Sequence, residues 1–146
     1  MRVFEARLAF QLVHGGEEEP LTTTKRLLAF LAGGLTGSFQ ESFWIVCMNP
    51  KRRPICRMRL GTGPLIATQV GVRDVFRAAL LAEARALACL RTECGDVPRP
   101  TPAEDRLVRA LRETAKHMNI EFADYLVAKL DSPDYHSWRE HDHCRE

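Results

Sequence analysis

The stretch that decides the fold is ALACLRTECGDVPRPTPAEDRLVRAL, residues 86–111. It begins with a short apolar run, which is typical of a strand buried on both faces of a sheet. A loop rich in glycine and proline follows, and loops of this kind often present metal ligands, yet the stretch contains no histidine. A strong helix start comes next, with Thr101 at the N-cap, Pro102 in the first turn and Glu104 completing a capping box.

The sequence on either side of this stretch predicts alternating strands and helices. Apolar and polar residues alternate over 4–12, which predicts a half-buried strand, and threonines before an apolar helical pattern predict a helix over about 22–32. Two short β-type runs around NPKRRP in residues 41–61 predict a hairpin. Alanines and leucines at helical spacing predict a long helix over 70–87.

Residues 101–119 form the clearest helical pattern in the chain, and residues 120–130 predict a further strand. Residues 132–140 predict a terminal turn or a short strand. The resulting order, β-α-β-β-α-β-α-β, favours an α/β sandwich in which helices flank a mixed sheet.

Composition excludes several classes of protein. The 146 residues suffice for one domain with a proper core, and a net charge of +2 gives no sign of a polyanion partner. Five cysteines without regular spacing fit a reducing cytosol better than a disulfide framework. No apolar run approaches the roughly 20 residues of a membrane span. We therefore expect a cytoplasmic protein with no membrane partner.

Four local phrases, in this order, resemble the JAB/MPN domain of the bacterial RadC-like proteins over residues 22 to about 140. They are ESFWIVCMNPKRRPI (41–55), LGTGPLIATQVGVRDVFRAALLAEARAL (60–87), DVPRPTPAEDRLVRAL (96–111) and DYLVAKLDSPDYHSWRE (124–140). The resemblance implies a JAB/MPN-like, cytidine-deaminase-like three-layer sandwich. It implies a single domain over 1–146, in which 1–21 supply an N-terminal strand and loop and 141–146 a loose tail.

The resemblance also implies a site. In active members of the family, a His-x-His pair and an aspartate hold a zinc ion. A serine follows the second histidine after seven intervening residues, the aspartate lies three residues beyond the serine, and a glutamate at the start of the hairpin polarises the zinc-bound water. Such chemistry is sensible, because three protein ligands leave one position for a water whose pKa zinc lowers toward neutrality.

On this chain the two histidine positions fall on Arg91 and Glu93. The serine position falls on Thr101, the aspartate position on Glu104 and the general-base position on Glu41. A guanidinium has no lone pair to give and brings a positive charge to the place of the cation. We hypothesise that Arg91 replaces the metal by pairing with carboxylates, that no cofactor is bound where active relatives bind zinc, and that Glu41 is catalytically silent.

Each of these residues has a structural alternative. Glu41 could simply be the polar residue that opens a strand. Thr101 and Glu104 satisfy a helix N-terminus whether or not they belong to a site.

Cysteines and histidines elsewhere offer further metal-binding arrangements. Cys47, Cys56, Cys89 and Cys94 could form a relocated zinc site, but they include no C-x-x-C pair. Cys94 could also act as a nucleophile, although the loop offers it no neighbouring base. The terminal HSWREHDHC, residues 136–144, holds three histidines and a cysteine, which we interpret as adventitious.

Three hypotheses of function follow. The leading one is a non-catalytic module that binds or scaffolds an unidentified protein partner, by strand addition beside the Glu41 hairpin. The first alternative is a metal-dependent hydrolase, an isopeptidase or metallopeptidase or a DNA-repair nuclease, in which Glu93 and Glu104 hold Mg²⁺ or Mn²⁺. The second is a DNA-binding accessory protein whose basic turn, Lys51 to Arg53, contacts phosphates; a solvated hairpin tip is the simpler interpretation of that turn.

Overall fold

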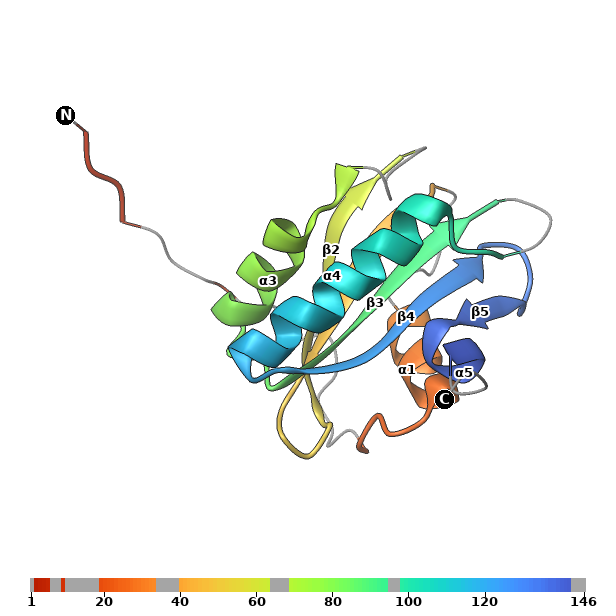
Figure 1. Ribbon diagram of the computed structural model, residues 1–146, viewed down its shortest axis with the longest axis horizontal. Coiled ribbons are helices and arrows are strands. Elements are labelled where there is room, and N and C mark those ends of the chain that lie inside the picture. The colour runs from red at the N-terminus through yellow and green to blue at the C-terminus, as the bar shows by residue number, and fades with distance from the viewer. Residues whose placement is uncertain are drawn as a thin grey trace.

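A mixed five-stranded sheet forms the centre of the protein, whose computed structural model describes residues 2–5, 9, 19–33, 40–63, 69–94 and 98–142. The strands are β1 (Ser42–Met48), β2 (Pro54–Thr62), β3 (Ala86–Glu93), β4 (Glu121–Lys129) and β5 (Tyr135–Ser137), and the helices are α1 (Thr24–Ala32), α3 (Val72–Leu81), α4 (Pro102–Met118) and α5 (Trp138–Asp142). The strand order is β2-β1-β3-β4-β5 (Figure 1). Strands β3 and β4 are parallel, and the other neighbours are antiparallel.

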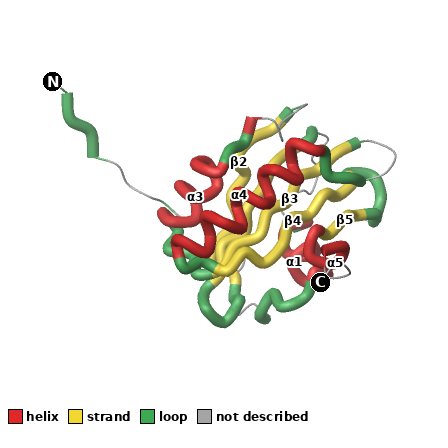
Figure 2. The backbone as a smooth tube through the Cα atoms, in the orientation of Figure 1, coloured by secondary structure: helices red, strands yellow, loops and turns green. Residues whose placement is uncertain are grey.

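Helices cover both faces of the sheet (Figure 2). Successive residues of a strand point to opposite faces, and β1 shows this directly. Phe43, Ile45 and Cys47 join the apolar cluster under α3 and α4, whereas Val46 and Met48 join the cluster under α1. This arrangement confirms the predicted α/β sandwich with a mixed sheet.

The local patterns explain most of the elements. The predicted hairpin is β1 and β2, and the predicted helix over about 22–32 is α1, capped by the side chain of Thr23. Helix α4 has the predicted capping box at Thr101, and its C-cap, Asn119, adopts the left-handed conformation common at helix C-termini. The segment predicted as a terminal turn or short strand contains β5, followed by the short α5.

The helix predicted over 70–87 is wrong at its C-terminal end. Helix α3 stops at Leu81, and Glu83 follows in the left-handed region with φ of 55°. Ala86 and Leu87 already belong to β3, where they pair with Met48 and Cys47 of β1. Pairing across the sheet therefore overrides the helical spacing of alanine and leucine, and β3 extends to Glu93, so that Arg91 and Glu93 lie on a strand and not in the loop.

The strand predicted over 4–12 is not found among the residues that the structure describes there. Residues 2–5 and Ala9 carry no strand, Val3 and Phe4 are 87% and 85% exposed, and the remainder of the range lies outside the described residues. Figure 1 shows residues 2–5 well away from the sheet.

Candidate functional site

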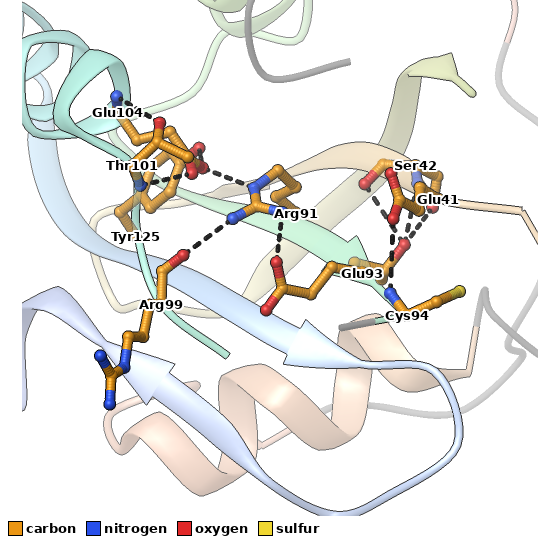
Figure 3. Close-up of polar contacts among 10 residues, drawn as sticks. Glu41, Ser42, Arg91, Glu93, Cys94, Arg99, Thr101, Glu104 and Tyr125 are labelled. Atoms are coloured by element: carbon orange, nitrogen blue, oxygen red, sulfur yellow. Dashed lines mark hydrogen bonds and ion pairs between the residues drawn. The ribbon is translucent and has the colours of Figure 1, made fainter. Parts of the chain in front are cut away.

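A cluster of charged side chains lies at the carboxyl end of β3, where the chain turns toward α4. Arg91, on β3, is only 7% exposed, and Glu104, in the first turn of α4, is fully buried. Arg91 Nε donates to Glu104 Oε2 over 2.7 Å, and Nη1 donates to Glu93 Oε2 over 2.8 Å. Nη2 donates to the carbonyl oxygen of Arg99 over 3.0 Å (Figure 3). The guanidinium thus binds two carboxylates and one carbonyl.

The carboxylate of Glu104 has a partner on each oxygen. The backbone N–H of Thr101 donates to Oε1 over 3.0 Å, and the Thr101 hydroxyl accepts from the Glu104 N–H over 3.1 Å, which completes the capping box. The Tyr125 hydroxyl, from β4, donates to Oε2. Glu104 therefore caps α4 and pairs with Arg91 at once, so the structural and the site interpretations of this residue coexist.

Tyr125 is the member of the cluster that the sequence analysis missed. It is fully buried and packs against Phe43, with ring centroids 5.9 Å apart. The sequence does carry one sign of this contact, a tyrosine on the apolar face of the strand predicted over 120–130. A buried tyrosine hydroxyl needs a hydrogen-bond partner. Burial, and then the charge of Glu104 and its hydrogen bond, raise the pKa of Tyr125, so the phenol stays a neutral donor.

Electrostatics keep Arg91 charged. Burial acts to lower the pKa of its guanidinium, but the hydrogen bonds and charges of Glu104 and then Glu93 outweigh burial and raise the pKa above its ordinary value. A cation therefore stands permanently between two carboxylates that would repel each other without it.

Glu41 lies at the neighbouring strand end, immediately before β1. Its carboxylate accepts from the backbone N–H of Cys94 over 3.4 Å, and its carbonyl oxygen accepts from Gly63 N over 2.7 Å, which closes the base of the hairpin. Figure 3 shows Glu41 on the far side of Arg91 from Glu104. The antiparallel pairing of β1 with β3 thus brings Glu41 to the end of the sheet that carries Arg91 and Glu93.

The cluster does not fit a zinc ion. The carboxylates of Glu93 and Glu104 point at a guanidinium that occupies the space between them. A bound zinc ion needs lone-pair donors, and Arg91 has none. Among residues 2–5, 9, 19–33, 40–63, 69–94 and 98–142, no three His, Cys, Asp or Glu side chains are grouped so that they could hold a metal.

The basic turn of the hairpin is tied to the sheet. Arg52 makes a bidentate ion pair with Glu121 of β4, and this hydrogen bonding lowers the pKa of Glu121 although burial opposes it. The Asn49 side chain accepts from the backbone N–H groups of Lys51 and Arg53 over 2.9 and 3.0 Å. One of the three basic side chains is thus paired with Glu121. DNA binding by this turn stays a prediction.

An open depression of about 460 Å³ adjoins the cluster beyond Arg99. It is lined by Pro98, Arg99, Pro133, Asp134, Tyr135, His136 and His141. The rings of His136 and His141 stack with centroids 4.0 Å apart, and burial, followed by the charge of His141, lowers the pKa of His136. The other two members of the terminal group, His143 and Cys144, lie outside the described residues.

The protein is an α/β sandwich in which the charged cluster lies between the end of the middle strand, β3, and the capped start of α4. A family model described as RadC-like JAB domain matches residues 21–143. The chain belongs to this family. The matched range contains every helix and strand given above. No helix in the described part of the chain has the length and apolar character needed to cross a membrane.

Proposed function

We propose that this domain is a non-catalytic member of the RadC-like JAB family that works as a protein-binding or scaffold module. One observation carries the proposal: the Arg91 guanidinium is buried and holds Glu93 and Glu104 at 2.8 and 2.7 Å. A permanent cation that supplies charge but no lone pair stands at the position that the family resemblance assigns to a metal ligand. In this proposal the chain keeps the fold of the family, and the side chain of Arg91 stabilises that fold.

The alternative hydrolase would hold Mg²⁺ or Mn²⁺ through the oxygens of Glu93 and Glu104. Both carboxylates would first have to release Arg91. Removing one partner of a buried ion pair typically costs roughly 3–5 kcal/mol, because the remaining charge stays desolvated. Metal binding would have to supply that free energy before any catalysis began, so the contacts of Arg91 favour the scaffold.

The partner surface that the fold offers is the outer edge of β2. Among the described residues, β2 ends the sheet, and an end strand can accept an extended segment of another protein through backbone hydrogen bonds. Ile55 is 41% exposed on this strand, and Arg59 is also exposed. Gly63, which directly follows β2, donates its backbone N–H to the carbonyl oxygen of Glu41 at the base of the hairpin.

Affinity capture from the cells that express the protein tests the binding role. The bait is the full chain as wild type, as Ile55→Glu on β2, and as Leu81→Glu, another exposed aliphatic position, on α3. We expect one protein to be retained by the wild type and by Leu81→Glu and lost with Ile55→Glu. Equal capture by all three baits, or capture by none, would contradict strand addition at β2.

Restoring imidazoles tests the silent site. We expect Arg91→His/Glu93→His to gain zinc affinity, so that added Zn²⁺ raises its melting temperature by mass action. The matched control, Arg91→Met/Glu93→Met, removes the same charges without supplying ligands and should not respond. A wild-type protein that responds to Zn²⁺ as strongly as the histidine variant would overturn the proposal.

A further inference from the structure

Two cysteines face each other across the β1–β2 hairpin, outside the Arg91 cluster. Cys47 and Cys56 are partners in the antiparallel ladder, and both contact the apolar cluster under α3. Directly opposed residues in such a ladder have Cα atoms about 4.5–5.5 Å apart and side chains on one face. A disulfide needs a Cα separation of about 4.4–6.8 Å. The separation of opposed residues falls within this range, so the pairing places the two cysteines where a disulfide can form.

The two thiols differ in access and in acidity. Cys47 is fully buried, whereas Cys56 is partly exposed on the end strand. A hydrogen bond between the two side chains raises the pKa of Cys47, and burial raises it further. The same hydrogen bond lowers the pKa of Cys56, although burial opposes it. Cys56 is thus both the thiol that a reagent reaches and the one that ionises first, and the thiolate is the reactive form.

We propose that Cys47 and Cys56 form a site of reversible oxidation at which a peroxide generates a disulfide within the hairpin. The Cys56 sulfur attacks one oxygen of hydrogen peroxide, the O–O bond breaks, and the products are a sulfenic acid and one water. The Cys47 sulfur then attacks the Cys56 sulfur, and the S–O bond breaks. The thiol proton of Cys47 leaves with the hydroxyl group as a second water. Two thiols lose two electrons in total, and the peroxide gains them.

The other cysteines set the controls. Cys94 is exposed, and Cys144 belongs to the terminal group, so both are replaced by serine to remove competing thiols. Cys89 is the third thiol in the apolar cluster under α3, and it lies close enough to influence the pKa of Cys47. It pairs across the sheet with Ile45 and not with Cys47, so it should not compete with Cys56.

Peptide mapping of the oxidised full chain tests the proposal. The reduced protein is treated with an equimolar amount of hydrogen peroxide, free thiols are blocked, and the chain is digested with trypsin without reduction. Cleavage after Lys51 and Arg52 places the two cysteines in separate peptides, residues 27–51 and 53–57. We expect these peptides to appear as one linked species, lighter than their sum by two hydrogen atoms and separated by a reductant. The intact chain should lose the same mass.

The variants decide which sulfurs react. Cys56→Ser should abolish the linked species, and Cys89→Ser should leave its yield unchanged. Recovery of peptide 27–51 unlinked after oxidation of the Cys94→Ser/Cys144→Ser protein would overturn the proposal, as would linkage of Cys47 to Cys89. Should Cys56→Ser fail to fold, the tryptic map of the oxidised Cys94→Ser/Cys144→Ser protein still decides: peptides 27–51 and 53–57 joined to each other support the proposal, and any other linkage of peptide 27–51, or none, contradicts it.

Discussion

Arg91 is the residue on which the site depends. Its guanidinium is nearly inaccessible, yet it meets Glu104, Glu93 and the Arg99 carbonyl within hydrogen-bond distance. Desolvation of a buried charge is compensated only when such partners are present and well placed. A cation that is fully paired in this way holds together a cluster that two carboxylates alone would push apart.

Removal of this cation should therefore destabilise the domain. We expect Arg91→Met to lower the free energy of unfolding by roughly 3–5 kcal/mol, because the buried carboxylate of Glu104 loses its counterion. Arg99→Met is the matched control, since that side chain is exposed and its backbone carbonyl is kept; it should change stability by less than about 0.5 kcal/mol. Denaturant unfolding measures both.

Coupling gives the sharper test of the same pair. Arg91→Met/Glu104→Gln should lose less stability than the two single variants lose together, because Glu104→Gln removes the fully buried charge that Arg91→Met leaves without its counterion. Strict additivity, or a loss below about 1 kcal/mol for Arg91→Met alone, would be incompatible with a buried ion pair at the centre of the site.

The family resemblance predicts the position of this residue and its pairing with carboxylates, but not its full set of neighbours. The motif of the resembled family assigns site positions to Arg91, Glu93, Glu104 and Glu41, and the structure brings the first three into direct contact. Tyr125 was out of reach, because its contact with Glu104 spans 21 positions of the chain and depends on β4 lying beside β3. A tyrosine on the apolar face of a strand signals that its hydroxyl needs a partner, but not which residue supplies that partner.

At the scale of elements, Asp124 on β4 connects α1 with the C-terminal segment. Its Oδ2 accepts from the hydroxyls of Thr24 (3.3 Å) and Ser137 (2.5 Å), and its Oδ1 accepts from the backbone N–H groups of Tyr125 (2.7 Å) and Arg139 (2.9 Å). One fully buried carboxylate thereby ties together α1, β4, β5 and α5.

The pKa of Asp124 gives this connection a pH dependence. Burial raises the pKa above its ordinary value of 3.8, although the four hydrogen bonds act to lower it. The native state thus holds the proton more firmly than the unfolded state does. The stability that the group contributes is complete below the unfolded value and is lost as the pH rises through the raised native value.

Asp124→Asn should remove that dependence, because an amide does not titrate. We expect the stability of the wild type, relative to Asp124→Asn, to fall as the pH rises above 3.8, by about 1.4 kcal/mol for each unit by which the native pKa is raised. Asp131→Asn, at a side chain that is 73% exposed, is the control and should show no such trend. A difference that stays constant or increases with pH would refute the account.

Element boundaries show where local patterns stop being sufficient. The α4 capping box and the hairpin were predictable because their signals are local: Thr101 and Glu104 lie three positions apart, and a basic turn separates two β-type runs. The end of α3 was not, because Ala86 and Leu87 fit a helix equally well and only pairing with β1 selects the strand. Long-range pairing decides such ambiguous segments.

At the scale of the whole molecule, the sheet separates two apolar layers, and the residues of the candidate site lie at strand ends. The Arg91 cluster lies where β3 ends and α4 begins, and Glu41 lies where β1 begins. The RadC-like JAB match over residues 21–143 covers both. In the proposed account, the ion pair of Arg91 and Glu104 takes the place of a metal in holding the start of α4 to the end of β3.

Metal analysis of the purified full chain tests this central claim most directly. The protein is produced with zinc and manganese supplied, dialysed, and measured by mass spectrometry beside the Arg91→His/Glu93→His variant. The account predicts that the wild type keeps no stoichiometric metal while the histidine variant retains zinc. One tightly held zinc ion per wild-type chain, whose removal by a chelator lowers the melting temperature, would contradict it.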